Sequence, residues 1–182
     1  VALNILKLSG IPIPIGVIGY DNFGSIFSSL IQESNMVEDG IIIDEGRPTT
    51  AKTRIIAHNQ HLVRIDKESK EYISKKVQDK ILNFLSSNLN ELDGIILQDY
   101  NKGVLTPALI EKIINLANKK NILITVDPKF NNFFNYKNVT VFKPNRKEAG
   151  DALGIRITSE EDIDFTGNHL LKKLNAKYIL LT

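Results

Sequence analysis

Polar and charged side chains follow three short apolar segments of the sequence, where they could hold a phosphorylated ligand. They lie in residues 98–103 (QDYNKG), 127–129 (DPK) and 143–148 (KPNRKE). Each loop carries Lys, which binds phosphate as a point charge, together with Asp, Asn or Glu. These residue types predict a site for a polar or phosphorylated small molecule.

The third loop admits two interpretations. Asn145 followed three residues later by Glu148 has the spacing of a helix capping box, in which each side chain bonds to the other's backbone N–H. A helix N-terminus at the end of a strand also favours anions. A carboxylate there is unusual unless a cation intervenes, so Glu148 would orient a water bound to Mg²⁺ beside a nucleotide phosphate.

The first two loops are equally open. Asp99 could simply cap its loop, with Gly103 supplying a left-handed turn. Alternatively, Asp99 and Lys102 could hold a sugar hydroxyl and a phosphate. In the second loop Pro128 stiffens the turn and displays Lys129 at the edge of the sheet.

A basic segment near residue 50 is either an ordinary charged sheet edge or a lid. In the lid interpretation its inner face holds Lys52, Arg54 and Asn59 over a sugar phosphate. Closure of such a lid would exclude water from a reacting phosphoryl group. Residues 41–66 read as a small β appendage because two extended runs flank Asn59-Gln60.

Alternating strand and helix patterns are expected to position these loops. Short, continuously apolar strands separated by helices predict an α/β fold, with a parallel sheet covered by helices on both faces. Ligands bind beyond the carboxyl ends of such strands. The expected strands are 13–19, 94–98, 122–126, 139–142 and 178–182, and the expected helices are 1–9, 22–34, 70–90, 106–119, 145–153 and 160–175.

Composition excludes several classes of protein. The chain has 182 residues, a formal net charge of +2, no cysteine and three histidines. Disulfides, thiolate catalysis and zinc–sulfur sites are therefore excluded, and the charge gives no nucleic-acid footprint. No apolar stretch could span a bilayer and no signal segment opens the sequence, so we expect a cytoplasmic protein. The phosphate-loop, dinucleotide-binding and hydrolase-elbow motifs are missing.

Four segments, taken in order, resemble the PfkB/ribokinase-like carbohydrate kinases. They are GRPTTAKTRIIAHNQHLVRID, QDYNKGVLT, VDPK and KPNRKEA. The last contains the N-x-x-E motif of the superfamily, and the first two are most similar to the heptose-7-phosphate kinases of ADP-heptose synthesis. The resemblance implies a ribokinase-like fold and an ATP-dependent kinase that uses Mg²⁺. It also implies phosphorylation of D-glycero-D-manno-heptose 7-phosphate at the anomeric hydroxyl.

The resemblance assigns expected roles to these residues. It divides the chain into a kinase core, residues 1–40 and 67–182, and a β lid, residues 41–66. Because an exposed strand edge invites pairing, a homodimer could form through the lid. The resemblance implies a nucleotide site at Asn145, Arg146, Lys147 and Glu148, with Glu148 reaching Mg²⁺ through water, and a substrate site at Lys52, Arg54, Asp99, Lys102 and Lys129. Asn59 of the lid and Asp127 of the second loop complete the expected substrate site.

The catalytic base of this family lies in a Gly-Ala-Gly-Asp segment, which the resemblance places beyond Thr182. No residue of the sequence is therefore nominated as the base, and a chain truncated at both ends is expected. Two alternatives stay open at this point: a kinase of the same family for another sugar, and a non-catalytic module that binds a sugar phosphate or a nucleotide.

Overall fold

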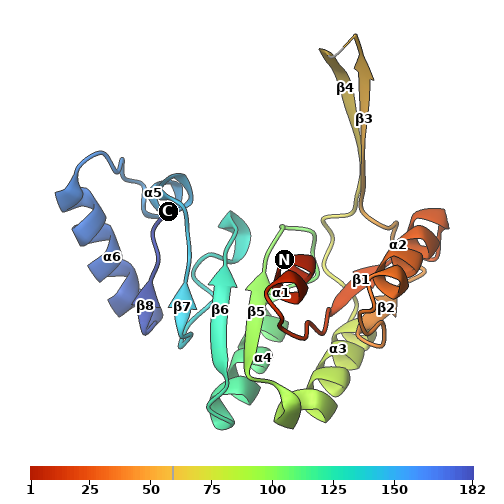
Figure 1. Cartoon of the computed structure of the whole chain (residues 1–182). Coiled ribbons are helices and arrows are strands. Elements are labelled where there is room, and N and C mark those ends of the chain that lie inside the picture. Colours follow the sequence, from red (N-terminus) through yellow and green to blue (C-terminus); the bar gives the residue numbers. More distant parts are fainter. Residues whose placement is uncertain (59) are drawn as a thin grey trace. The chain divides into compact units, whose positions relative to one another are not determined.

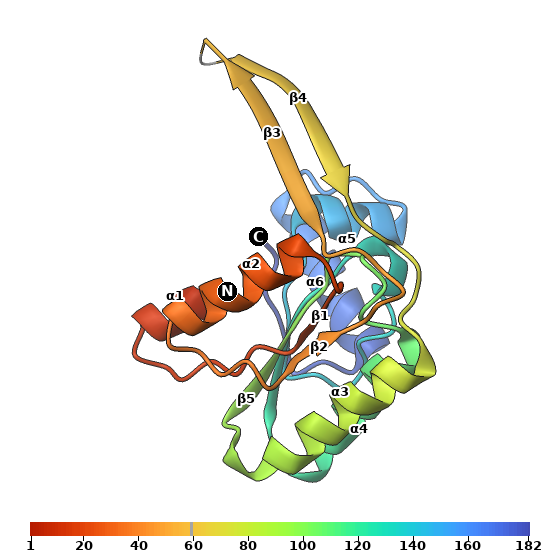
Figure 2. The same ribbon diagram turned by 90° about the vertical axis from the view of Figure 1, so that its right-hand side faces the viewer.

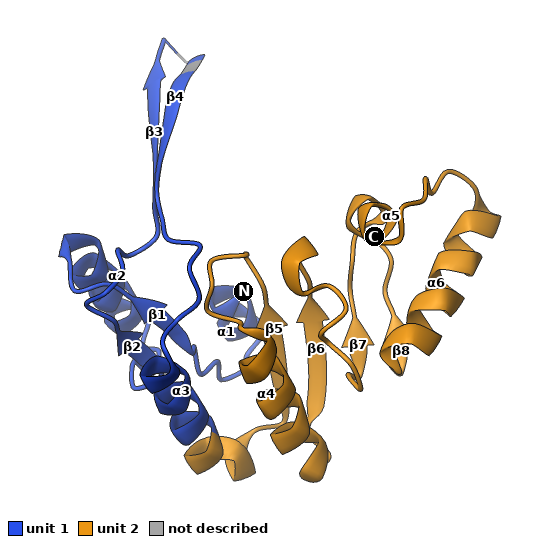
Figure 3. Cartoon of the chain, turned by 180° about the vertical axis from the view of Figure 1, so that it is seen from behind, with its two compact units in different colours: residues 1–85 blue, residues 86–182 orange. Residues whose placement is uncertain are grey.

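The computed structural model describes residues 1–58 and 60–182, and of His61 it describes the backbone alone. The chain forms two compact units, Val1–Leu85 and Ser86–Thr182 (Figure 3). The first holds α1 (Ala2–Lys7), β1 (Gly16–Ile18), α2 (Asn22–Glu33), β2 (Ile41–Ile43), β3 (Ala51–Ala57), β4 (Gln60–Lys67) and most of α3 (Lys75–Asn88). The second holds η1 (Leu89–Glu91), β5 (Gly94–Gln98), α4 (Pro107–Lys119), β6 (Leu123–Asp127), η2 (Phe130–Asn132), β7 (Val141–Phe142), α5 (Arg146–Leu153), α6 (Glu160–Leu174) and β8 (Tyr178–Ile179).

A four-stranded parallel sheet organises the second unit, in the order β5-β6-β7-β8 (Figure 1). Its core is formed by alternate strand residues that share one face, among them Leu97, Ile124, Val126 and Phe142, all buried. α4 packs against β6, and α6 packs against β8. The mostly parallel α/β fold expected from the strand pattern is thus confirmed.

The first unit contains two separate strand pairs. β1 and β2 run parallel, whereas β3 and β4 form an antiparallel hairpin that extends away from the rest of the unit (Figure 2). The predicted appendage, residues 41–66, therefore needs a correction at its start: Ile41–Ile43 pairs with β1, and the hairpin begins at Ala51. The division into a kinase core and a lid stays a prediction, and Asn59, in the predicted turn, lies outside the described residues.

The base of the hairpin is tied to the start of α2. The carboxylate of Asp21 caps this helix by accepting the Gly24 N–H at 2.9 Å, and it also accepts the Thr49 N–H at 3.1 Å and the Lys67 ammonium at 3.4 Å. Hydrogen bonds from Thr49 and from the Gly24 backbone hold the pKa of Asp21 below its usual value. Gly19 is needed beside them, because a Cβ there would lie 2.4 Å from the Arg47 carbonyl oxygen.

Helix α6 begins with a capping box that makes stability depend on pH. The Asp162 carboxylate accepts the backbone N–H groups of Thr158 and Ser159, both at 2.9 Å. These bonds lower its pKa from 3.8 to about 2. A carboxyl with a depressed pKa in the folded state stabilises the fold above its unfolded pKa and loses that contribution as pH falls through its folded value.

Asp162→Asn is therefore expected to lower the melting temperature near neutral pH. The deficit should shrink between about pH 4 and pH 2, where the carboxylate of the unmodified protein becomes protonated. Thermal unfolding of both proteins at a series of pH values measures this, and a deficit that stayed constant down to pH 2 would contradict it.

Among the described residues, no helix has the length and apolar character needed to cross a membrane.

Candidate functional site

The three predicted loops meet at one edge of the four-stranded sheet. Gln98 and Asp127 end the adjacent parallel strands β5 and β6, lie opposite each other, and join through a side-chain hydrogen bond. The Asp99 N–H donates to the Asp127 carbonyl oxygen at 3.1 Å. Lys143 follows β7 and its ammonium lies 3.5 Å from the Asp127 carboxylate. The second unit thus collects its predicted site residues where parallel strands end.

Lys129 and Glu148 form an ion pair at this edge. Their side chains are 34% and 16% exposed, so the pair is partly shielded from water. Partial burial would lower the pKa of Lys129, but its hydrogen bond to Glu148 and nearby negative charges raise it above its usual value. Those charges belong to Glu148, Asp127 and Asp99. Lys129 is therefore an ammonium set among three carboxylates.

Glu148 also takes part in the capping box that its spacing predicts. The Asn145 side chain accepts the Glu148 N–H at 2.8 Å, and the Glu148 carboxylate accepts the Asn145 N–H at 3.0 Å. Besides closing this cap, the Glu148 carboxylate pairs with the Lys129 ammonium. The side chains of Arg146 and Lys147 are exposed beside them, and the Arg146 N–H donates to the Thr182 carbonyl at 2.8 Å.

Asp99 lies inside the second unit, with only 3% of its surface exposed. Its carboxylate accepts the Tyr136 hydroxyl at 2.7 Å, the Asn132 amide at 3.2 Å and the Asn101 N–H at 2.8 Å. Gly103, in the same loop, has φ of +75°, the left-handed turn expected there. These contacts support the loop-capping interpretation of Asp99 over contact with a sugar hydroxyl. Lys102 is half-buried in this loop.

The lid residues of the prediction belong to the first unit, on the hairpin. The Lys52 ammonium pairs with Asp66 at 3.1 Å and with Glu68 at 3.3 Å, so its charge is already balanced. Arg54 lies directly opposite Arg64 across the two strands. Like charges directly opposite each other destabilise a hairpin, and here the Arg64 guanidinium pairs with the Asp66 carboxylate at 2.9 Å.

Sequence reasoning missed several residues of these clusters: Arg64 on the hairpin, and Asn132 and Tyr136 at the sheet edge. The spacing of Arg54 and Arg64 about the predicted turn could have revealed the first. Nothing in the local pattern indicates that Asn132 and Tyr136 reach Asp99, because these contacts join residues 33 and 37 positions apart.

Glu148 suits the way magnesium binds beside a nucleotide. Among the described residues, no three acidic or histidine side chains gather into a ready-made metal site. Mg²⁺ does not need one, because it keeps several waters and takes one or two carboxylates together with substrate phosphates. The partly exposed Glu148 carboxylate, whose present counter-charge is a flexible lysine, meets that requirement.

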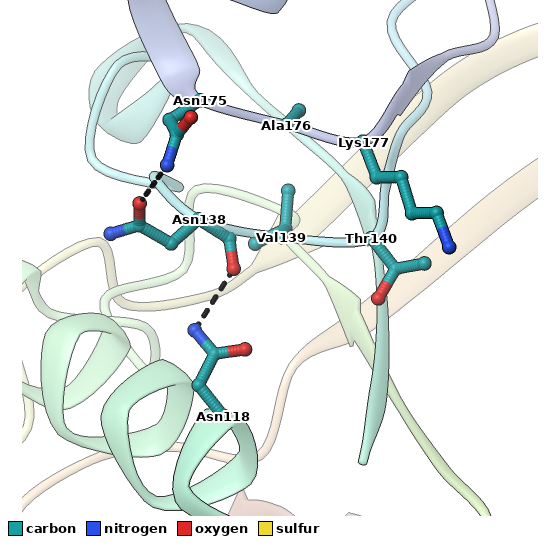
Figure 4. A pocket seen from close by; sticks show the side chains of 7 residues that line it. All are labelled: Asn118, Asn138, Val139, Thr140, Asn175, Ala176 and Lys177. Atoms are coloured by element: carbon teal, nitrogen blue, oxygen red, sulfur yellow. Dashed lines mark hydrogen bonds between the residues drawn. The ribbon is translucent and has the colours of Figure 1, made fainter. Parts of the chain in front are cut away.

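A pocket at the opposite edge of the sheet has a structural explanation. It lies at the amino ends of β7 and β8, where the Asn175 amide donates to the Asn138 side chain at 2.7 Å (Figure 4). The Asn118 amide donates to the Asn138 carbonyl at 3.0 Å. Asn138 and Asn175 both have positive φ, which asparagine tolerates in turns. These asparagines serve the chain reversals, and the pocket lies away from the predicted ligand edge.

Comparison with known proteins gives a consistent result. The model of the pfkB family of carbohydrate kinases matches residues 1–182. The bifunctional protein HldE of Wolinella succinogenes is 37% identical over 179 residues, which is 98% of this chain and 38% of that protein. HldE of Helicobacter pylori strain HPAG1 is 40% identical over 163 residues, which is 90% of this chain and 35% of that protein. The chain thus spans little more than a third of the length of these relatives.

Solved structures agree on the fold. Phosphofructokinase-2 of Escherichia coli in its tetrameric inhibited form superposes with a TM-score of 0.72 at 16% identity, covering 98% of this chain and 58% of that one. Ribokinase of Giardia lamblia gives 0.70 at 17% identity, covering 92% and 51%. Together with the family match over the whole sequence, the sheet and its loops lead to one conclusion. The chain belongs to the PfkB family of carbohydrate kinases.

Proposed function

We propose that the protein is an ATP-dependent kinase that phosphorylates D-glycero-D-manno-heptose 7-phosphate at its anomeric hydroxyl. The observation that carries the proposal is the pairing of Lys129 with Glu148 at the carboxyl edge of the sheet. It joins the predicted phosphate-binding loop to the N-x-x-E motif of a PfkB kinase. The heptose substrate follows from the lid and QDYNKG segments, and the similarity to HldE supports it.

In the proposed reaction, the sugar hydroxyl attacks the γ-phosphate of ATP in line with the leaving group. Positioning and electrostatic stabilisation supply most of the catalysis in such transfers. The N-terminus of α5, with Asn145, Arg146 and Lys147, would bind the nucleotide phosphates. Glu148 would orient a water on Mg²⁺, which, when bound, neutralises charge on these phosphates. None of the described residues is assigned as the base.

The hairpin would act on the sugar side. Arg54 presents a guanidinium group, which binds phosphate with fixed geometry, and the 7-phosphate is the anion we assign to it. Arg64 lies opposite Arg54 but pairs with Asp66. The apolar side chains of Ile55, Val63 and Ile65 on the hairpin are exposed, which supports a lid that pairs with a second copy of the chain. Dimerisation and a cytoplasmic location stay predictions.

Release of ADP in the full-length protein tests the proposal. We expect turnover with heptose 7-phosphate and a higher KM for the unphosphorylated heptose. Arg54→Gln should raise the KM for the phosphorylated sugar about tenfold, the loss of one charged hydrogen bond. It should leave the KM for the unphosphorylated sugar within about twofold, because no phosphate is then present to bind.

Three other outcomes separate the alternatives. Turnover with a different sugar alone would assign the protein to another branch of the family. Thermal stabilisation by nucleotide or sugar phosphate without ADP release would indicate the binding module. Equal effects of Arg54→Gln on both sugars would reject its contact with the 7-phosphate.

A further inference from the structure

The carboxylate assigned to the nucleotide site is already in use. One oxygen of Glu148, Oε1, contacts the Lys129 ammonium, and the other, Oε2, accepts the Asn145 N–H at 3.0 Å. A cation that approaches Glu148 therefore meets the Lys129 ammonium at one oxygen and the cap of α5 at the other. Displacing the lysine is the smaller change, because it moves one side chain, whereas opening the cap would break the hydrogen bond between Glu148 and the Asn145 N–H that begins α5.

Lys129 is placed so that its ammonium can move. Its backbone follows the buried Pro128 and its carbonyl oxygen accepts the Asn132 N–H at 3.3 Å, whereas its side chain is 34% exposed. A lysine carries a compact charge on a flexible four-carbon stem. The ammonium can thus exchange Glu148 for another anion without rearrangement of the strand end.

The surrounding charges set the conditions for this exchange. The negative charges of Asp127 and Asp99 also act on the Lys129 ammonium. Lys143 partly compensates this charge through its ion pair with Asp127. A divalent cation that arrived without nucleotide would leave the displaced ammonium with a weaker partner. A cation that arrived with polyphosphate would bring a new anion for Lys129.

We propose that Lys129 is a positioning residue that competes with a divalent cation for Glu148 and transfers to the nucleotide phosphates when both arrive together. The site then favours the metal–nucleotide complex over the free metal ion. This inference rests on the proposed function in taking the polyphosphate to be that of ATP. The competition at Glu148 itself is a property of this chain and can be measured without any nucleotide.

The test measures binding of Mn²⁺ alone to the full-length protein, from the paramagnetic resonance signal of the free ion. Lys129→Met keeps the side-chain length and removes the charge. It should bind Mn²⁺ about tenfold more tightly than the unmodified protein, a coupling of ordinary size between neighbouring sites. Calorimetry in the absence of metal should show that Lys129→Met binds ADP about fivefold more weakly than the unmodified protein does.

Two further variants make the result specific. Lys129→Arg keeps the positive charge and should retain the weak Mn²⁺ binding of the unmodified protein. Lys143→Met removes a charge from the same sheet edge but from Asp127, and should change Mn²⁺ affinity by no more than about twofold. If Lys143→Met raised the Mn²⁺ affinity as much as Lys129→Met does, the total positive charge at the sheet edge, and not the contact with Glu148, would govern metal binding.

Unchanged or weaker Mn²⁺ binding in Lys129→Met would overturn the proposal, since a merely structural ion pair predicts that result. Failure of the kinase proposal looks different. In that case the unmodified protein would bind no ADP. The Mn²⁺ affinities of the unmodified protein and Lys129→Met would still show whether Lys129 competes with the metal ion for Glu148.

Discussion

Replacing Glu148 with Gln is expected to lower the turnover of the full-length kinase about 100-fold, the usual cost of removing one preorganised charge from a transition state. The amide keeps an oxygen that can accept the Asn145 N–H, so the capping box of α5 survives. What it loses is the negative charge that pairs with Lys129 and would hold the metal-bound water. ADP release, measured over a range of Mg²⁺ concentrations, should show both the lower rate and a greater Mg²⁺ requirement.

A carboxylate elsewhere on the same helix provides the matched control. Asp151 is exposed on α5, and Asp151→Asn removes the same charge without touching Lys129 or the cap. It should leave turnover within about twofold of the unmodified protein, as expected for a surface substitution. If Glu148→Gln retained full activity and the normal Mg²⁺ dependence, Glu148 would have no role in the nucleotide site.

Elements with strong local signals were predictable from the sequence. β5 occupies residues 94–98 as expected. α4 begins after Thr106, whose hydroxyl accepts the Leu109 N–H at 3.1 Å, with Pro107 at its first position. Asn145 likewise caps α5. In each case a residue and its near neighbours carry the whole signal, so distant contacts are not needed to find the element.

Element ends that depend on pairing or on backbone donors were less predictable. The strand expected over 13–19 is confined to Gly16–Ile18, and Pro12 and Pro14 before it have no N–H to offer a neighbouring strand. The helix expected from residue 70 begins at Lys75, where the Ser74 hydroxyl accepts the Val77 N–H at 3.3 Å. The parallel pairing of β2 with β1 joins distant segments, which no local pattern reveals.

The candidate site divides in the same way. Parallel-sheet geometry was enough to predict that Asp127, Lys129 and Glu148 share one edge. It could not predict that Lys129 reaches Glu148 directly, because that contact depends on the path of the chain between β6 and α5. Nor could it predict the burial of Asp99, since loop residues have no periodicity from which an inward direction can be read.

Two roles for Asp99 can therefore be tested against each other: its buried contacts support a loop cap, whereas the resemblance implies a substrate ligand. Asp99→Ala is expected to lower the free energy of unfolding by about 3 kcal/mol, because it removes the three hydrogen bonds that the buried carboxylate accepts from Tyr136, Asn132 and the Asn101 N–H. Urea unfolding of the full-length protein measures the loss. Tyr136→Phe removes one donor and should cost only about 1 kcal/mol, since the carboxylate keeps its other partners.

The two substitutions share one interaction, so their costs should not add. With Tyr136 already replaced by Phe, the loss caused by Asp99→Ala should shrink by about 1 kcal/mol, the coupling expected of groups in direct contact. Kinetics then decide the functional question. A loop-capping Asp99 predicts that Asp99→Glu, which keeps the charge but does not fit the same partners, is also destabilised. A stable Asp99→Ala protein with a selectively raised sugar KM would instead make Asp99 a substrate ligand and contradict the role that its burial assigns to it.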